Sequence, residues 1–239
     1  MQSDTTNQGW DNPNLGLEFC EAAKTASGVA SSTLGSVIVF SHGVGSLVVA
    51  SALGTNQCSF GSETRWYSAM APFETALAAD SAASLCNSYS AMSSVLDAFQ
   101  VCYAKPSSGH GVEEGVTAQA STYTPTGGVT LQNARSMAET HLDGALCGHD
   151  PMGLYTGVGT GFLSIWSYVW FDFENDGWMD TESCTEIKSA GSWQYLSDAV
   201  WSNLHINFAD GTCRFGNALL DPWFDQSPCT WYKTMAQRA

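Results

Sequence analysis

The segment 37–53 (VIVFSHGVGSLVVASAL) contains the residues whose types and spacing say most about chemistry. A short β-branched apolar run feeds a tight turn of small residues at 41–45, and an apolar helical stretch follows at once at 46–53. A nucleophile on such a strained strand-to-helix turn is presented to a substrate, and N–H groups at the start of the helix help to stabilise an oxyanion. The segment therefore has the pattern of a turn that could present a nucleophile.

This segment resembles the lipase and esterase branch of the α/β-hydrolase superfamily, in which a motif of the type H-S-x-G often precedes a run like L-V-x-x-A-L. The residues that fall on this pattern are His42, Gly45, Leu47, Val48, Ala52 and Leu53. The resemblance places Gly43 at the nucleophile position and the N–H of Val44 in the oxyanion hole. Because the motif is short, an ordinary strand-turn-helix of another α/β fold is the alternative.

Gly43 has no side chain and cannot be acylated, so the resemblance implies a catalytically impaired protein. Ser41 and Ser46 lie nearby, but neither is flanked two positions away by small residues on both sides. Either serine would need a different turn to act as the nucleophile. The question of whether Ser41 or Ser46 replaces the missing hydroxyl therefore stays open at the level of sequence.

The resemblance implies that the acid and the histidine of a catalytic triad follow the nucleophile in that order. An N-D-G turn after a late apolar strand makes Asp176 the candidate acid, which would orient and stabilise an imidazolium. Asp-Gly is also a common turn without any catalytic role. The same stretch holds Asp172, Glu174, Asp180 and Glu182. Their spacing is not that of a calcium-binding EF-hand loop, so we expect no metal site there.

His205 follows Asp176 in the sequence and is the candidate general base, because histidine titrates near neutral pH. The resembled family often has N-H-x-D in this region. In the register that aligns Asn207 and Asp210 with that pattern, Phe208 occupies the histidine position and His205 stands three residues early. His205 is thus either the base or a structural histidine. In the second case the chain lacks the base as well as the nucleophile.

Charge and composition exclude several classes of function. The chain has 23 acidic and 8 basic residues and a formal net charge of -15, which disfavours nucleic acids and anionic membranes as partners. No apolar run reaches the length of a transmembrane helix. His110, His141 and His149 show no metal-ligand spacing, so neither a metal nor a cofactor is expected. The oligomeric state is left open.

Eight cysteines are spread along the chain without any C-x-x-C pair. The even count and wide spacing predict four disulfides in an oxidising compartment, with the pairing open. Buried free thiols in a cytosolic protein are the alternative. We therefore expect a secreted or extracellular protein. Residues 1–14 are polar and contain no signal-peptide core, which indicates that a signal was removed or that N-terminal sequence is missing.

Helices alternate with short apolar strands along the chain, which predicts one α/β domain over residues 1–239. Helices are expected at 15–32, 46–53, 76–94, 131–146 and 191–204, and strands at 34–40, 66–72 and 163–173. A stretch rich in Gly, Ser and Thr at 107–128 is expected to be a long loop within a lid or cap insertion at 103–160.

The strand-to-helix turn at 41–45, here called the elbow, lies early in the chain, and this indicates how complete the expected fold is. Only 42 residues precede Gly43, whereas the resembled family has several strands before the elbow. The expected fold is therefore a partial or reduced α/β-hydrolase sheet with flanking helices, stabilised by disulfides. Trp166 and Trp170 are expected in its core, and Trp178 could line an apolar substrate cleft.

Two functions follow from these features. The first is a protein related to secreted esterases and lipases, impaired at Gly43, whose substrate would be a small-molecule or lipid ester if any activity remains. The second is a non-catalytic secreted protein that uses a hydrolase scaffold to bind a ligand or a partner. A fragment without a function of its own is a further alternative.

Overall fold

The computed structural model describes residue 5, residues 7–74, 76–88, 102–104 and 110–147, and the single residues 187 and 237. The elements expected at 163–173 and 191–204 lie outside these ranges, as do the three tryptophans named above. The elements in chain order are α1 (Pro13–Ser27), β1 (Thr33–Leu34), β2 (Ile38–His42), α2 (Val44–Gly54), β3 (Ser59–Phe60), β4 (Arg65–Ala69), α3 (Leu77–Ser88), β5 (Cys102–Ala104), β6 (His110–Val112), α5 (Glu114–Thr117), α6 (Leu131–His141) and β7 (Gly144–Leu146).

Three parallel strands form the main sheet in the order β2-β4-β7. In its register, Ile38 lies opposite Arg65, His42 opposite Ala69, and Ala69 opposite Leu146. Parallel neighbours need a crossover connection, and α2 lies in the connection from β2 to β4 and α6 in that from β4 to β7. Two smaller sheets accompany it: β1 pairs in parallel with β3, and β5 pairs antiparallel with β6. The fold is therefore mixed α/β with parallel strands, as predicted.

The helix ends follow from local chemistry. The side chain of Asn12 caps α1 by accepting the N–H of Asn14 at 3.0 Å, and Pro13 opens the helix, where its missing N–H is harmless. Gly28 ends α1 in the left-handed conformation, with φ at 68°. Thr130 caps α6 in the same way as Asn12, accepting the N–H of Asn133.

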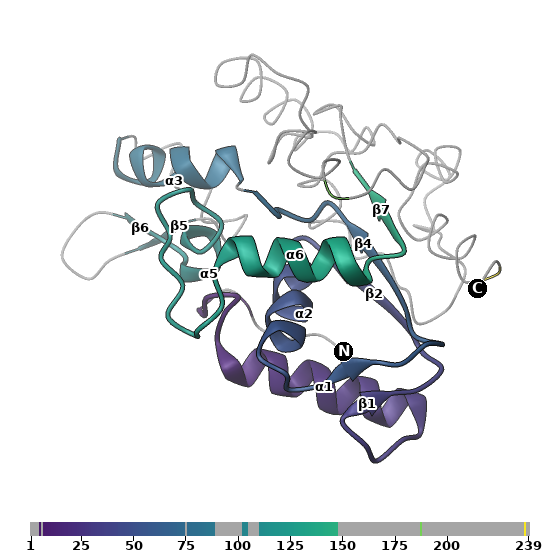
Figure 1. The fold of residues 1–239 in the computed structure, drawn as a ribbon. Helices are drawn as coiled ribbons and strands as arrows, with labels where there is room; N and C mark the ends of the chain where they lie inside the picture. The colour runs from purple at the N-terminus through teal and green to yellow at the C-terminus, as the bar shows by residue number, and fades with distance from the viewer. Residues whose placement is uncertain are drawn as a thin grey trace, which may run out of the picture.

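Helix α2 is the centre of the packing. All residues from 46 to 53 are buried, so the helix is enclosed all round rather than amphipathic. It contacts both α1 and α6, and Figure 1 shows it between these two helices. Trp66 of β4 and Leu47 of α2 are almost fully enclosed in the main core. The helix that follows the proposed elbow is thus held rigidly by its neighbours.

Residues 131–146 were expected to be one helix, and this prediction is wrong at its C-terminal end. Helix α6 stops at His141, and Leu142 takes up extended backbone before β7. The Asp143 N–H donates to the Trp66 carbonyl at 2.8 Å, and the Asp143 carboxylate accepts the Trp66 N–H at 2.8 Å. This pairing with β4 overrides the local helical preference.

Residues 107–128 were expected to be a long loop, but β6 and α5 lie within them. The insertion expected at 103–160 also contains α6 and β7, and β7 belongs to the main sheet. A lid therefore stays a prediction, and it would have to end before Leu131. The boundaries of the other elements shift modestly: the helices expected at 15–32 and 76–94 are α1 and α3, and the strand expected at 66–72 is β4.

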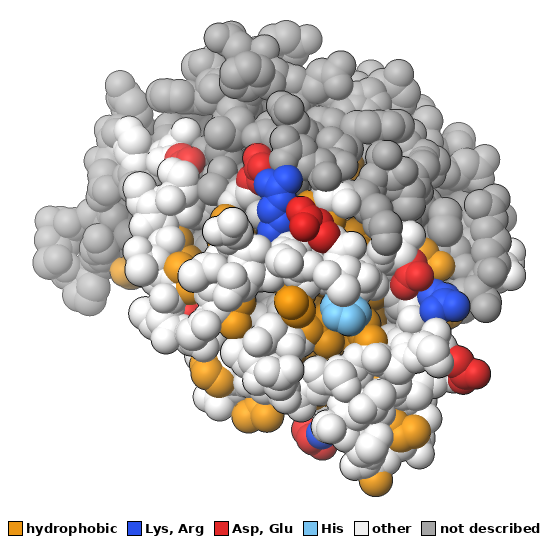
Figure 2. Space-filling view, in the orientation of Figure 1, with side chains coloured by type: hydrophobic (Ala, Val, Ile, Leu, Met, Phe, Trp, Pro, Cys, Tyr) orange, Lys and Arg blue, Asp and Glu red, His pale blue; other side chains and the backbone are white. Residues whose placement is uncertain are grey.

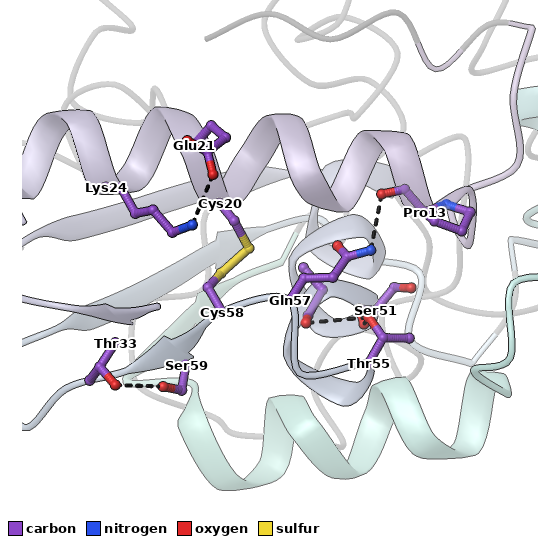
Figure 3. The surroundings of a disulfide bond; sticks show 11 residues. Pro13, Cys20, Glu21, Lys24, Thr33, Ser51, Thr55, Gln57, Cys58 and Ser59 are labelled. Carbon is purple, nitrogen blue, oxygen red and sulfur yellow. Dashed lines mark hydrogen bonds and ion pairs between the residues drawn. A yellow bond between two sulfur atoms is a disulfide. The ribbon is translucent and has the colours of Figure 1, made fainter. Parts of the chain in front are cut away.

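Disulfides form part of the described fold. Cys20 of α1 is bonded to Cys58 just before β3, across a separation of 38 residues (Figure 3). Cys86 of α3 is bonded to Cys102 of β5, across 16 residues. Cys147 is disulfide-bonded as well, so every cysteine within the described ranges is oxidised. The prediction of disulfides is confirmed for these five cysteines. Within the same ranges, no helix has the length and apolarity needed to cross a membrane.

Candidate active site

Gly43 makes the whole turn between β2 and α2. The strand ends at His42, the helix begins at Val44, and Gly43 adopts φ 51° and ψ -131°. Ser41 and His42, expected in the turn, instead belong to the strand. The Gly43 N–H donates to the carbonyl of Ala69 at 2.9 Å, and its carbonyl accepts the Ser46 N–H at 3.0 Å. Residues with a side chain rarely adopt this backbone, so the turn is a strained strand-to-helix junction at which glycine relieves the strain.

Among the described residues, none crowds the position of a side chain at Gly43. Gly43 is itself buried, yet no described atom lies within 4 Å of the position that a Cβ would take. Gly45 shows the same absence of described neighbours. The small residue expected there for close backbone passage is therefore not required by the described packing. Within the described part of the chain, the limit on a side chain at position 43 comes from the positive φ of the backbone.

The start of α2 supplies the backbone donors of this turn. The N–H groups of Val44 and Gly45 lie in the first helical turn, where no intrahelical acceptor is available. The dipole of the helix adds positive potential at this end. A helix start of this kind matches the predicted role of the Val44 N–H in an oxyanion hole, and that role stays a prediction.

Ser41 and Ser46 are both buried and bonded to each other. Their hydroxyl oxygens are 2.9 Å apart, and the indole N–H of Trp66 donates to the Ser41 hydroxyl at 2.8 Å. Ser46 has no exposed surface and Ser41 is 7% exposed. These hydroxyls tie β2, α2 and β4 together inside the core. In this arrangement both hydroxyls are engaged with each other and enclosed by the core.

The residues just beyond the three strands form a row at one edge of the sheet. Gly43, Met70 and Cys147 each follow the last residue of β2, β4 and β7. The Met70 N–H donates to the Leu146 carbonyl at 2.7 Å, as the Gly43 N–H does to Ala69. Met70 also has a positive φ, 51°, although it carries a fully buried side chain. The carboxyl edge of a parallel sheet is where α/β proteins place their ligand sites, and here it holds two residues with left-handed backbone.

The candidate acid and base are not brought to this edge by the described structure. Asp176, His205 and Phe208 lie outside the described residues. His141 is at the end of α6, and its ring packs edge-on against Phe60 with centroids 5.8 Å apart. Within the described ranges, no group of three or more His, Cys, Asp or Glu side chains could hold a metal ion.

A cavity of about 300 Å³ lies near this edge, beyond β4. Its lining includes Leu47 of α2, Pro72, Trp10, Tyr123 and Leu131. Sequence reasoning missed it, because its walls come from four segments far apart in the chain with no shared motif. The one local signal was Trp10, a large aromatic residue in an otherwise polar N-terminal stretch.

Asp11 fixes the wall of this cavity. Its carboxylate accepts the Tyr123 hydroxyl and the backbone N–H groups of Thr126 and Gly127. Burial favours a higher pKa for Asp11, but the hydrogen bonds from Tyr123, Gly127 and Thr126 outweigh it and lower the pKa. A Cβ on Gly127 would meet the Asp11 carbonyl oxygen at 1.8 Å, so only glycine allows this close approach. The neighbouring Trp10 indole donates to the Ala118 carbonyl at 3.0 Å.

The described part of the chain is a mixed α/β fold in which a parallel sheet, a strained turn and a central helix follow one another. No protein-family model matches the chain, and no curated protein matches it. Among solved structures it is similar to the Bacillus licheniformis lipase BlEst2. The mature form of that lipase superposes with a TM-score of 0.50 at 15% identity, covering 81% of this chain and 70% of that one. The propeptide form gives 0.47 at 14% identity, covering 81% and 38%. At such identities the likeness shows the fold alone.

Proposed function

We propose that this chain is a secreted relative of esterases and lipases that has lost acyl-enzyme chemistry. The observation that carries the proposal is the backbone of Gly43, φ 51° and ψ -131°, at the junction of β2 and α2. A strained junction of this kind is where a hydrolase of this fold presents its nucleophile. In this proposal the chain keeps such a junction and lacks the hydroxyl. The disulfides support an oxidising, extracellular location.

The proposed deficit is specific to one step of the reaction. Ester hydrolysis by this route needs a hydroxyl oxygen that attacks the carbonyl carbon while a base takes its proton. The alcohol of the ester then leaves with that proton, and water hydrolyses the acyl-enzyme that remains. Ser41 and Ser46 are buried and bonded to each other, which argues against either as a substitute. The Val44 N–H remains the proposed oxyanion donor. Oxyanion stabilisation and binding without a nucleophile give only a small residual rate.

The test is to restore the hydroxyl with Gly43→Ser and to compare it with Gly43→Ala. Alanine imposes the same backbone strain without adding a nucleophile, so the pair separates chemistry from folding. We expect covalent labelling by a fluorophosphonate probe, and turnover of a p-nitrophenyl ester, in Gly43→Ser only. Labelling of the unmodified protein would overturn the proposed loss of function, and thermal melting of both variants shows whether each has folded.

The acid and base can then be assigned in the Gly43→Ser background. Asp176 and His205 are the proposed acid and base. Asp150 follows the end of β7 by four residues in the sequence and is a second carboxylate to test. Asp176→Asn and Asp150→Asn are therefore matched variants, and the one that abolishes labelling identifies the acid. His205→Gln should abolish it too if His205 is the base.

A non-catalytic binding role is the second candidate function, and the cavity beside Leu47 favours it. A scaffold that no longer turns over a substrate can still hold a ligand at the carboxyl edge of its sheet. If neither Gly43→Ser nor the unmodified protein reacts with the probe while both are folded, this binding role replaces the hydrolase relationship as the explanation of function.

A further inference from the structure

The chain between β4 and α6 leaves the main sheet at its carboxyl edge and returns to the same edge. β4 ends there at Ala69, and α6 begins there, because it carries the chain back to the start of a parallel strand. Residues 77–117, here called the α3–α5 unit, lie between these points and include α3, β5, β6 and α5. Figure 1 shows these elements gathered beyond the end of β4 and the start of α6. The unit is therefore attached at the edge that carries Gly43.

The α3–α5 unit is held together by contacts of its own. α3 contacts β6 and α5, β5 contacts β6, and the Cys86–Cys102 disulfide joins α3 to β5. The apolar side chains that its described residues bury are small, namely Ala79, Ala82 and Val116 beside the two half-cystines. Each of them removes little apolar area from water. A unit with its own covalent link and small buried side chains can open locally while the rest of the fold stays intact.

The N-terminal turn at 9–12 holds the segment 118–127, which leads out of this unit. A hydrogen bond between the backbone of its last and first residues closes the turn at 3.0 Å. Trp10 and Asp11, at its centre, are only 1% and 2% exposed. The Trp10 indole donates to the Ala118 carbonyl, and the Asp11 carboxylate accepts one hydroxyl and two backbone N–H groups from further along the same segment. Both central side chains of the turn thus hold one segment.

The same segment is also bonded to the α3–α5 unit, so the two would move together. Asp80 of α3 accepts the N–H and the hydroxyl of Ser121 at 2.7 and 2.9 Å. On the other side of the unit, the chain that enters it is held to α6 by the ion pair of Glu74 with Arg135, at a partly exposed position. Figure 2 shows basic groups on this face of the molecule beside acidic ones. Exposed ion pairs contribute little, whereas hydrogen bonds to the enclosed charge of Asp11 contribute more.

We propose that the N-terminal turn 9–12 is a latch that holds the α3–α5 unit at the carboxyl edge of the sheet, and that the unit opens when Trp10 and Asp11 release the segment 118–127. The cavity described above supports this position of the latch, because Leu47 of α2 and residues 118–121 line it together. Release would therefore uncover the first turns of α2. The latch is a property of the fold, and its role in admitting a substrate to position 43 rests on the proposed function.

Native-state hydrogen exchange tests whether the unit opens on its own. In the unmodified protein, amides at 110–127 should exchange through an opening that depends weakly on urea, whereas those of α2 should exchange only on global unfolding, with a steep dependence. Asp11→Asn should speed exchange at 110–127 about ten- to hundredfold, because it weakens hydrogen bonds to a buried charge. One steep urea dependence shared by both regions, or unchanged exchange in the variant, would overturn the latch.

Two tyrosine variants form a matched pair for the same measurement. Tyr123→Phe removes a hydroxyl that donates to Asp11, whereas Tyr103→Phe removes one from β5, where the side chain is 40% exposed. Exchange at 110–127 should rise about fivefold in the first variant and less than twofold in the second. Equal changes in the two variants would refute the contact of Tyr123 with Asp11 as part of the latch.

A thiol at position 43 tests access to the elbow without any acyl chemistry. Every cysteine in the described ranges is disulfide-bonded, and the unmodified protein provides the blank. N-ethylmaleimide should alkylate Gly43→Cys about tenfold faster when Asp11→Asn is added, and should alkylate the exposed control Ser31→Cys at one rate in both backgrounds. Equal rates at position 43 would show that the latch does not control the elbow and would overturn that role. Faster alkylation there, without fluorophosphonate labelling of Gly43→Ser, would support the latch and reject the proposed function.

Discussion

The indole N–H of Trp66 donates to the hydroxyl of Ser41 at 2.8 Å, inside the core and two residues before the turn at Gly43. The Ser41 hydroxyl is bonded in turn to Ser46 at the start of α2. A short chain of polar contacts thus fixes the strand, the helix and the neighbouring strand that together shape the elbow. Each of these groups is buried, so each depends on the others for a partner.

Replacing Ser41 by alanine should destabilise the protein by about 1–3 kcal/mol, because it leaves the Trp66 N–H and the Ser46 hydroxyl without their partner. Urea unfolding of the variant measures this loss. Ser59→Ala is the control, since its hydroxyl is bonded to Thr33 on the exposed surface and its loss should stay within about 0.5 kcal/mol. Equal losses of stability in the two variants would show that the buried hydrogen bonds of Ser41 contribute no more than an exposed one.

The backbone of position 43 predicts opposite effects for two glycine substitutions. Gly43→Ala should destabilise the fold by about 1–3 kcal/mol, because a Cβ is strained at φ 51° and ψ -131°. Gly45→Ala, in ordinary helical backbone with no described atom near the new methyl group, should be neutral or stabilising by about 0.5–1 kcal/mol. The midpoints of thermal unfolding measure both. A stabilising Gly43→Ala would contradict the assigned conformation.

Asp11 gives the fold a pH-dependent contribution. Its pKa is lowered in the folded protein, so its stabilising effect is complete above the pKa of the unfolded chain, near 4, and is lost as the pH falls through the lower folded value. Asp11→Asn should cost about 2–4 kcal/mol at pH 7, since it weakens three hydrogen bonds to a buried charge. The difference between wild type and variant should shrink at pH 3. Urea titrations at the two pH values measure the free energy of unfolding of both proteins. A difference between them that grows on acidification would show that the pKa of Asp11 is not lowered in the folded protein.

The two disulfides whose partners are both described should stabilise the fold by different amounts. Removing the Cys20–Cys58 bond with a double alanine substitution should destabilise the fold by about 3–4 kcal/mol, because the bond closes a longer loop in the unfolded chain. Removing Cys86–Cys102, with its shorter separation, should cost roughly 0.5–1 kcal/mol less. Denaturant unfolding of both double variants under oxidising conditions tests the order. A larger effect at the shorter loop would show that native packing, not loop closure, dominates.

The elbow could be predicted from sequence because its signal is local. An apolar run, small residues and a second apolar run indicate the order strand, turn and helix, and the helix expected at 46–53 is α2 at Val44–Gly54. The strand expected at 34–40 is β2 at Ile38–His42, so its start was placed four residues too early. The strand β7 could not be predicted, since it has three residues and exists only because Asp143 and Leu146 find partners on β4 and Met70. The cavity could not be predicted from the sequence either, because its wall depends on the long-range contact of Asp11 with Tyr123.

Because of the conformation of Gly43, replacing serine by glycine at this position and replacing glycine by serine have opposite effects on the stability of the fold. A change from serine to glycine removes a strained Cβ and so favours the folded state, whatever it does to catalysis. The reverse change must reintroduce that strain before any activity can return. Loss of the hydroxyl at such a turn is therefore a thermodynamically downhill step for the scaffold, and a return to catalysis would begin with a less stable protein.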